Sequence, residues 1–343
     1  MRKRYFSDVV ACTGAMIGAG FASGREVIAF FTRYGVHGWW LIGLSSGTMA
    51  FLCALCLQHA QKQTDPNGWY VLFGPVARMC TLLLMLLTGG AMLSAAGHMI
   101  AMVWSNRQAY FIGVLGTLTA AWMLSFGSLR PLSWLSGILT TVLLATTIVL
   151  IFWYEPAETP MVVMKDNNLL LAAVRSVAYA SMNMTLTMGV VCRCAQADAR
   201  KNLTLSAGLG CLMGLLLGCA HLLYTQNPQL LEEPFPIVRL LSRFGRNGYL
   251  LSTGMLYLSV LTTLVSIVLA IREAMAKLFI RRASANAFMM TVLVGISSVG
   301  FTGIVDRMYA PAGLLCLILV FIPVCFRRLD KVRINALPSK ITE

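Results

Sequence analysis

Long apolar segments recur from one end of this 343-residue chain to the other, and they restrict its fold more than any other feature. A helix of about 18 or more mainly apolar residues is long enough to cross the ~30 Å hydrocarbon core of a bilayer. The chain is 58% hydrophobic and only 12% charged, which is too little charge to cover the surface of a soluble domain of this length. The sequence therefore predicts an all-α polytopic membrane protein with the lipid bilayer as its surroundings.

We expect about ten transmembrane helices. They are predicted at residues 7–34, 38–61, 76–104, 109–126, 131–154, 168–192, 203–225, 246–279, 285–304 and 308–326. With a cytoplasmic N-terminus, 18 of the 27 Lys and Arg residues fall in inside segments and seven in outside segments. This positive-inside bias predicts that both termini are cytoplasmic, in a multi-pass protein of a bacterial-type inner (plasma) membrane. The net charge of +14 then reflects topology, and no nucleic-acid partner is expected.

The loops are short, so residues 1–343 are predicted to form a single transmembrane domain with no separate soluble part. Its halves are a first repeat at about 7–154 and a second repeat at about 168–326, followed by a cytoplasmic tail at 327–343. The longest expected outside stretches are 155–167 and 226–245. The second contains an amphipathic piece from Ile237 to Phe244. It fits either a partly helical lid or a plain surface loop.

No enzyme is indicated. The ten cysteines lie in or beside apolar segments, where a thiol behaves as a small hydrophobe, so neither a disulfide framework nor a metal site is expected. The HExxH signature is missing, and the acidic candidates at membrane depth are Asp8 and Glu26. We therefore expect no catalytic residues and no cofactor other than a coupling ion.

The first span of each half contains the residues least suited to a continuous lipid-facing helix. Span 1 carries four glycines between residues 14 and 24, each costing ~1 kcal/mol relative to Ala in a helix. Span 6 is rich in Ser, Asn and Thr over residues 179–189. Halves of five spans each must have opposite orientation, and interrupted helices at matching places in inverted halves indicate a transporter binding site. The sequence thus predicts two inverted five-helix repeats with helices 1 and 6 interrupted.

A different interpretation of span 1 is that its glycines serve close helix packing without any unwinding. The residues that follow argue against it. Arg25 and Glu26 come directly after the glycine cluster, and charges at this depth usually face a cavity or a partner.

The stretch from Ile17 to Val27, continuing to Phe30-Phe31 and Tyr34-Gly35, resembles the first-helix signature of the YkvI-type membrane proteins. These are amino-acid permeases of the amino acid–polyamine–cation superfamily, and they are similar to the LeuT-fold transporters. The resemblance covers nearly the whole chain. It implies two inverted five-helix repeats, broken helices 1 and 6, and alternating access.

The resemblance also implies a sodium site between helices 1 and 8, with Na⁺ as the possible coupling ion and no other metal. Thr262 and Thr263 match its hydroxyl ligands, and carbonyls near Gly14 and Ile17 match its helix-1 ligands. Alternatively, these hydroxyls bond only to carbonyls of their own helix. Span 5 has no Lys, which favours Na⁺ and leaves open H⁺ coupling through Glu26.

For a small-molecule solute, the resemblance implies a site built from polar and backbone groups of helices 1 and 6. The candidate substrate-binding residues are Ala19, Gly20, Phe21, Ser23, Tyr179, Ser181 and Asn183. The candidate gate residues are Arg25, Glu26 and Arg175. In the gate, one arginine would pair with Glu26 or with an acidic loop residue, the alternative being a structural charge pair.

The expected function is secondary active transport, a cation (Na⁺) coupled symport of an amino acid or similar small zwitterionic solute. The alternatives are a proton-coupled permease and a ligand-sensing membrane subunit without net transport.

Overall fold

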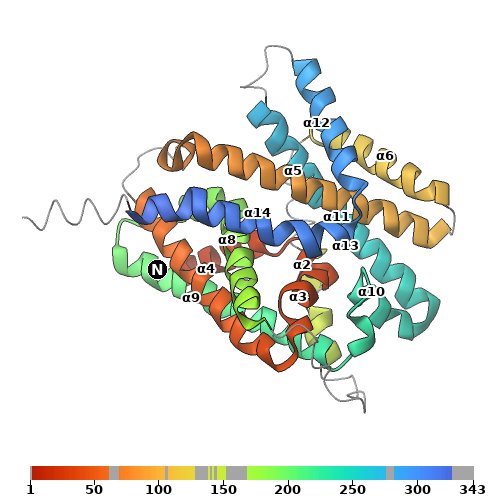
Figure 1. Ribbon diagram of the computed structural model, residues 1–343, viewed down its shortest axis with the longest axis horizontal. Coiled ribbons are helices and arrows are strands. Elements are labelled where there is room, and N and C mark those ends of the chain that lie inside the picture. Colours follow the sequence, from red (N-terminus) through yellow and green to blue (C-terminus); the bar gives the residue numbers. More distant parts are fainter. Residues whose placement is uncertain are drawn as a thin grey trace, which may run out of the picture.

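The computed structural model describes residues 2–61, 69–104, 107–127, 138–139, 141–142, 145–151, 168–275 and 282–326, and within them every regular element is helical (Figure 1). The first half comprises α1 (Arg2–Met16), α2 (Ala19–Ser23), α3 (Arg25–Phe30), η1 (Thr32–His37), α4 (Gly38–Ala60), α5 (Trp69–Trp104) and α6 (Arg107–Leu124). The second half comprises α8 (Leu169–Arg193), α9 (Ala199–Thr225), η2 (Pro228–Leu230), α10 (Pro236–Leu241), η3 (Ser242–Phe244), α11 (Gly245–Met275), α12 (Arg282–Ser297), α13 (Phe301–Gly303), η4 (Ile304–Met308), α14 (Tyr309–Cys316) and η5 (Leu317–Phe321).

Six of the described helical segments are long and apolar enough to cross a membrane. They are Thr32–Ala60, Gly74–Trp104, Leu169–Arg193, Ala199–Thr225, Pro236–Ala274 and Phe301–Phe326. Shorter apolar helices cover Gln108–Leu124 and Asn286–Ser297. The expected span 5, at 131–154, falls largely outside the described residues. The all-helical membrane class is confirmed, while the number of ten spans stays a prediction.

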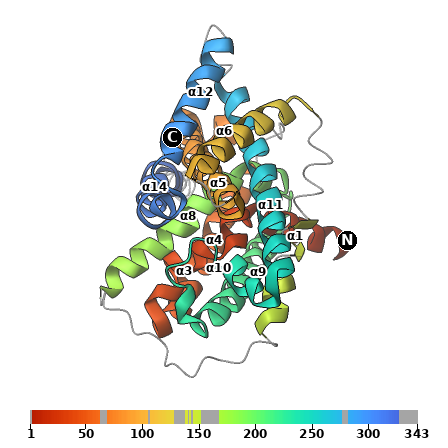
Figure 2. The same ribbon diagram turned by 90° about the vertical axis from the view of Figure 1, so that its right-hand side faces the viewer.

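The helices pack in two groups. In one group, α4 lies against α8 and α9, and α1 lies against the same two helices. In the other, α5 packs against α6, α11 and α12. Figure 2 shows α6 and α12 at the top of the molecule and α4, α9 and α10 in its lower part. Helices of the first half thus pack beside helices of the second in both groups, as two five-helix repeats would, and the repeat itself stays a prediction.

The first predicted span is broken, as its glycines indicate. The α1 helix ends at Met16, and Gly18 is extended, with φ −89° and ψ 179°. A second interruption follows at Gly24, whose φ of 86° lies in the left-handed region that favours glycine. The span is therefore three short helices, of which α2 packs against α10 and α11 while α3 packs against η4, α8 and α9.

The prediction of an interrupted helix 6 is wrong, because α8 runs without a break from Leu169 to Arg193. Its polar side chains bond to carbonyls of the same helix instead of marking an unwound stretch. Asn183 Nδ2 donates to Tyr179 O over 3.0 Å, and Thr185 Oγ1 donates to Ser181 O over 2.8 Å. Such bonds satisfy the polar atoms while leaving the backbone ladder intact.

A break does occur near the end of the described chain. Gly300, with φ 89°, separates α12 from α13, and the backbone widens to π-helical geometry over η4. The segment from α13 to α14 lies along α8 and α5 (Figure 1). It thereby brings residues 304–309 against the broken first span.

The stretch expected at 226–245 is helical in part, in η2, α10 and η3. Its α10 side chains Ile237, Val238 and Leu240 are buried. This hairpin packs onto α2 and α11, so it covers one end of the broken span. The lid interpretation is favoured over a plain surface loop.

Candidate functional site

The unwound part of the first span frees backbone groups inside the helix bundle. Gly18 N–H donates to Met16 O over 3.1 Å, whereas in a continuous helix it would bond to Gly14 O. The Gly14 carbonyl has therefore lost its helical donor. Ser23 stabilises the second interruption, because its hydroxyl donates to Gly20 O over 2.7 Å and accepts from Arg25 N over 3.2 Å.

A cavity of about 240 Å³ lies against this break. It is walled by α1, α2, α3, α5, α8, α11 and α14. Its lining residues are Ala15, Met16, Gly18, Ala19, Gly20, Glu26, Met85, Thr88, Met92, Met182, Asn183, Leu186, Thr187, Thr263, Ser266, Ile267, Ala270 and Tyr309. A volume below the ~300–1,000 Å³ of typical drug-sized pockets suits a small solute.

The two ends of the cavity differ in accessibility. At one end, Ala15 of α1 and Ser266 of α11 are exposed. At the other end, residues 19–32 are all buried. The cavity is therefore accessible from the side of Ala15 and Ser266 and closed on the side of Arg25.

The closed end is held by an ion pair between α3 and η4. Arg25 Nε donates to Asp306 Oδ1 over 3.2 Å, and Arg25 Nη2 pairs with Asp306 Oδ2. The remaining nitrogen, Nη1, donates to the carbonyls of Leu231, over 2.8 Å, and Glu233, over 3.3 Å. One guanidinium thus connects the broken span, the η4 segment and the hairpin.

Arg175 of α8 reaches the same place. Its Nη2 donates to Asp306 O over 2.8 Å, and its guanidinium lies 5.8 Å from the centre of the Phe30 ring. Both arginines that were candidate gate residues therefore meet at Asp306, one at its carboxylate and the other at its carbonyl. The third candidate, Glu26, turns away from them into the cavity.

Glu26 is buried, and its carboxylate lies against the Gly20 backbone on one side. On the other side, Tyr179 Oη donates to Glu26 Oε2 over 3.3 Å. No Lys, Arg or His lies among the residues that line the cavity with Glu26, so within this wall it has no cationic partner.

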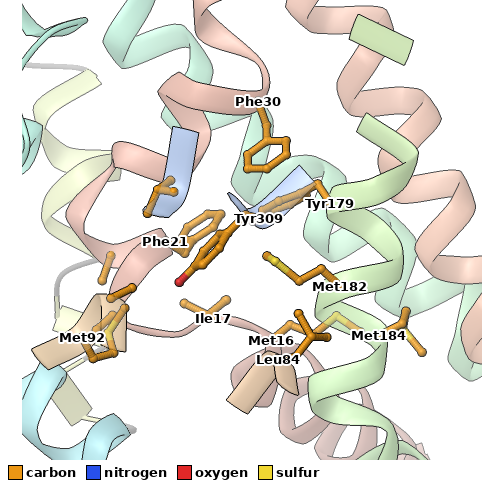
Figure 3. Packing of buried hydrophobic residues seen from close by; sticks show 14 of the residues in the cluster. Met16, Ile17, Phe21, Phe30, Leu84, Met92, Tyr179, Met182, Met184 and Tyr309 are labelled. Atoms are coloured by element: carbon orange, nitrogen blue, oxygen red, sulfur yellow. The ribbon is translucent and has the colours of Figure 1, made fainter. Parts of the chain in front are cut away.

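Tyr179 belongs to an aromatic cluster above the cavity, seen in Figure 3. Its ring centre lies 4.9 Å from that of Phe30 and 5.3 Å from that of Phe31. Tyr179 bonds to Glu26 at the cavity, and the Phe30 ring lies against the Arg175 guanidinium, so the cluster stands between the cavity and the arginines that bond to Asp306. An aromatic lid at Tyr179 is compatible with this position.

Some of the candidate substrate residues line the cavity and others do not. Ala19, Gly20 and Asn183 line the cavity, while Phe21, Ser23, Tyr179 and Ser181 are buried around it without lining it. Ser181 donates to Gly313 O of α14 and to Ala178 O. Its hydroxyl therefore joins α8 to α14.

Of the candidate ion residues, Gly14 and Ile17 directly precede the break of the first span, and Thr262 and Thr263 lie on α11. On α11, the hydroxyls of Thr262 and Thr263 both donate to Ser259 O, over 3.0 Å and 2.9 Å. Thr263 lines the cavity, as do Ala15 and Gly18, the neighbours of Gly14 and Ile17. Two hydroxyls and a carbonyl thus form an oxygen cluster on α11, of which Thr263 reaches the cavity, although each hydroxyl makes the bond within its own helix that the alternative interpretation expects.

Sequence reasoning missed three residues of this site: Asp306, Tyr309 and Thr88. Asp306 is the one acidic residue between positions 274 and 329, and that isolation was an available signal. The predicted boundary between spans 9 and 10 placed Asp306 in a loop. The sequence analysis expected an acidic loop residue as a gate partner but did not say which one. Tyr309 and Thr88 carried no signal, because a single hydroxyl in an apolar helix is unremarkable.

Comparisons with known proteins agree with this architecture. No model of a known protein family matches the sequence. The chain is 21% identical over 329 residues to the uncharacterized membrane protein YkvI of Bacillus subtilis (strain 168), covering 91% of this chain and 93% of that protein. The expected resemblance to YkvI-type membrane proteins is thereby confirmed.

Among solved structures, the chain is similar to MhsT, crystallised in complex with L-phenylalanine. The TM-score is 0.59 at 13% sequence identity, over 91% of this chain and 87% of that one. At this identity the likeness concerns the fold, which is the LeuT-like fold expected from the sequence.

Proposed function

We propose that this protein is a secondary active transporter that carries an amino acid or a similar small zwitterionic solute together with a cation, by alternating access. The observation that carries the proposal is the cavity at the break of the first span, accessible at Ala15 and Ser266 and closed by Arg25 and Asp306. A channel needs a continuous path, whereas a transporter needs a site that opens to one side at a time.

The direction of access follows from the predicted topology. If both termini are cytoplasmic, the Ala15 end of the cavity faces the cytoplasm and the Arg25–Asp306 pair lies on the outer side. The structure then corresponds to a state closed outward and accessible inward. Transport requires Arg25 and Asp306 to separate in the opposite state, with the hairpin at 228–244 moving away from α3.

The solute class is supported by the cavity and by the structural relative. The wall combines backbone and polar groups at Gly18, Gly20 and Asn183 with methionine side chains. The relative MhsT binds L-phenylalanine in its crystal structure. We therefore assign an amino acid, most suitably an apolar one, as the cargo.

For the coupling ion we propose Na⁺ at the oxygen cluster of Ser259, Thr262 and Thr263, completed by freed carbonyls near Gly14 and Ile17. Uncharged oxygen ligands suit a hard monovalent cation. A proton-coupled mechanism is the second candidate, favoured by the burial of Glu26 without a cationic partner in the described wall of the cavity.

The test is uptake by proteoliposomes containing the purified protein. An equimolar mixture of L-amino acids is offered outside, with an inward gradient of Na⁺ or of choline, and the retained solutes are identified by mass spectrometry. Accumulation that requires Na⁺ supports the proposal. Accumulation in choline that follows an imposed proton gradient supports the second candidate. Binding without accumulation under any gradient overturns transport in favour of a sensing role.

A further inference from the structure

The cavity holds an acidic side chain with no basic residue beside it in the described wall. Glu26 is 7% exposed, and its one hydrogen bond, from Tyr179 Oη, is 3.3 Å long. A carboxylate offers about four acceptor positions, so most of the capacity of Glu26 is unfilled. Burying an ionised group in this condition is unfavourable unless a cation joins it.

The nearby arginines bond to another residue and not to Glu26. Arg25 and Arg175 both bond to Asp306, on the far side of the Phe30–Tyr179 cluster. The lining residues of the cavity include no Lys, Arg or His. Within the described wall, Glu26 is therefore left to be neutralised by a proton or by a cation that enters the cavity.

The close approach of Glu26 to Gly20 shows how its position is fixed. A Cβ at residue 20 would coincide with the Glu26 side chain, so the carboxylate occupies the space that any other residue at this position would fill. The carboxylate is thereby held at the broken helix, on the cavity side. The absence of a side chain at Gly20 thus allows the first span to hold the carboxylate in this position.

Two further hydroxyls in the wall, those of Tyr309 and Thr88, lie beside each other. Tyr309 is 1% exposed, and apart from this mutual contact neither hydroxyl has a hydrogen-bond partner. Both residues line the same cavity as Glu26. Figure 3 shows Tyr309 reaching in among Ile17, Phe21 and Met182. Buried polar groups are normally satisfied, so these hydroxyls indicate a polar ligand at this position.

The remainder of the wall is apolar and adaptable. It is formed by Met16, Met85, Met92, Met182, Leu186 and Ile267. Methionine fills irregular gaps and adapts to ligands of different shape. A bare inorganic ion makes no use of such a wall, whereas an organic cation with an apolar body does.

We infer that Glu26 is the recognition group for a primary ammonium, so that the transported solute is a small amine with an apolar body, such as an apolar amino acid. The ammonium has three N–H donors, which the Glu26 carboxylate and the hydroxyls of Tyr309 and Thr88 can accept. The methionines then contact the apolar part. This inference rests on the proposed function and adds that the ammonium, more than the carboxylate, is the group the site requires.

Binding to the full-length protein in detergent tests this directly, by thermal stabilisation titrated with four matched probes. These are L-leucine, 3-methylbutylamine, which lacks the carboxylate, N-acetyl-L-leucine, whose nitrogen is uncharged, and 4-methylpentanoate, which lacks the nitrogen. Analogous sets are built on L-methionine and L-phenylalanine. A ligand that binds the folded state raises its stability in proportion to ligand concentration and affinity.

The inference expects the amino acid and the amine to bind, and the acetylated and deaminated forms to bind at least about tenfold more weakly, since bonds to a charged group are the strong ones. Glu26→Gln, nearly identical in shape, should weaken the amine-bearing probes by about tenfold or more. Tyr309→Phe should weaken them less. Glu273→Gln, the same change at an exposed position on α11, should have no effect.

The opposite results overturn the inference. They are equal affinity of Glu26→Gln and the parent for the amines, tighter binding of the acids or amides, or no binding by any amine in the three sets. A Glu26→Gln variant that keeps its affinity but loses a response to the proton gradient would make Glu26 a proton carrier. Proteoliposome uptake separates the two claims: accumulation of an anionic or neutral solute would leave the transporter standing while the amine assignment fails.

Discussion

Arg25 and Asp306, 281 residues apart in the chain, form a two-nitrogen ion pair that closes one end of the central cavity. Their side chains are 7% and 20% exposed, so the pair is largely shielded from water. The bonds from Arg25 to Leu231 O and Glu233 O attach the hairpin to the same guanidinium. The Arg25 guanidinium therefore joins α3, η4 and the hairpin at the closed end, which is the position expected of a gate residue.

Loss of the Asp306 charge should open this end. In Asp306→Asn, the buried Arg25 charge loses its counter-ion, and breaking one side of a buried pair costs ~3–5 kcal/mol. We expect faster amide hydrogen exchange in the hairpin at 228–244 and in α3, and reduced transport. Mass spectrometry of the exchanged peptides measures the first effect.

The matched control is an exposed ion pair, between Arg239 and Glu233. Arg239 and Glu233 lie 3.6 Å apart with side chains 66% and 38% exposed, and exposed pairs contribute little. Glu233→Gln should leave exchange in α3 at the parent level. Unchanged exchange in Asp306→Asn would show that the pair does not hold the end closed.

Sodium should stabilise the protein through Thr262 and Thr263. In the parent, the melting temperature should be higher in NaCl than in choline chloride at equal ionic strength. Thr263→Ala and Thr262→Ala should each remove most of that difference, because each deletes one oxygen of the proposed site. Differential scanning fluorimetry measures the difference.

Thr253 supplies the control on the same helix. Its hydroxyl donates to Tyr249 O over 2.8 Å, the same four-residue bond that Thr263 makes to Ser259 O, but it lies outside the central cavity. Thr253→Ala should keep the full sodium response. An equal loss in Thr253→Ala and Thr263→Ala would reduce the Thr pair to a structural role and contradict the sodium site.

Sequence patterns predicted those features that depend on local chemistry. The break of the first span followed from four glycines in eleven residues, because each weakens the helix wherever it packs. The same reasoning failed for α8, since it counted polar residues without asking where their bonds go. Asn183, Thr185 and Thr187 bond within the helix, and a helix that satisfies its own polar atoms has no reason to unwind.

The partners of the site residues could not be predicted from the sequence, for a different reason. Arg25 and Asp306 come together only because η4 crosses the broken span, and no local pattern specifies that crossing. The direction of Glu26 depends on the free space at Gly20, which is a property of the packed structure. The sequence thus indicated helices 1, 6 and 8 as parts of the site, but neither the walls supplied by α5 and α14 nor the side chains that meet there.

Gly313 should be essential for packing α14 against α8. A Cβ at this position would overlap the backbone of Ala178, and backbone cannot move aside as a flexible side chain can. Gly313→Ala should therefore lower the melting temperature by several degrees and disturb the Ser181 bond to Gly313 O. Gly47→Ala in α4, where a Cβ meets nothing within 4 Å, is the control and should melt at or above the parent temperature. Equal melting of the two variants would mean that α14 does not pack this tightly.

Gly20→Ala should act through Glu26. The added methyl group would occupy the place of the carboxylate and force it away from the broken helix, while α2 itself would accept alanine readily. We expect binding of L-leucine and 3-methylbutylamine to weaken by about tenfold or more, as in Glu26→Gln, with the fold retained. Gly43→Ala in α4, where a Cβ meets nothing within 4 Å, should bind both probes as the parent does. Because Gly20 has no side chain to contact an ammonium and the substitution keeps its carbonyl, a loss in Gly20→Ala that is not increased by adding Glu26→Gln would trace the effect to the position of one carboxylate. Additive losses would instead mean that the two residues act independently, contrary to the geometry found here.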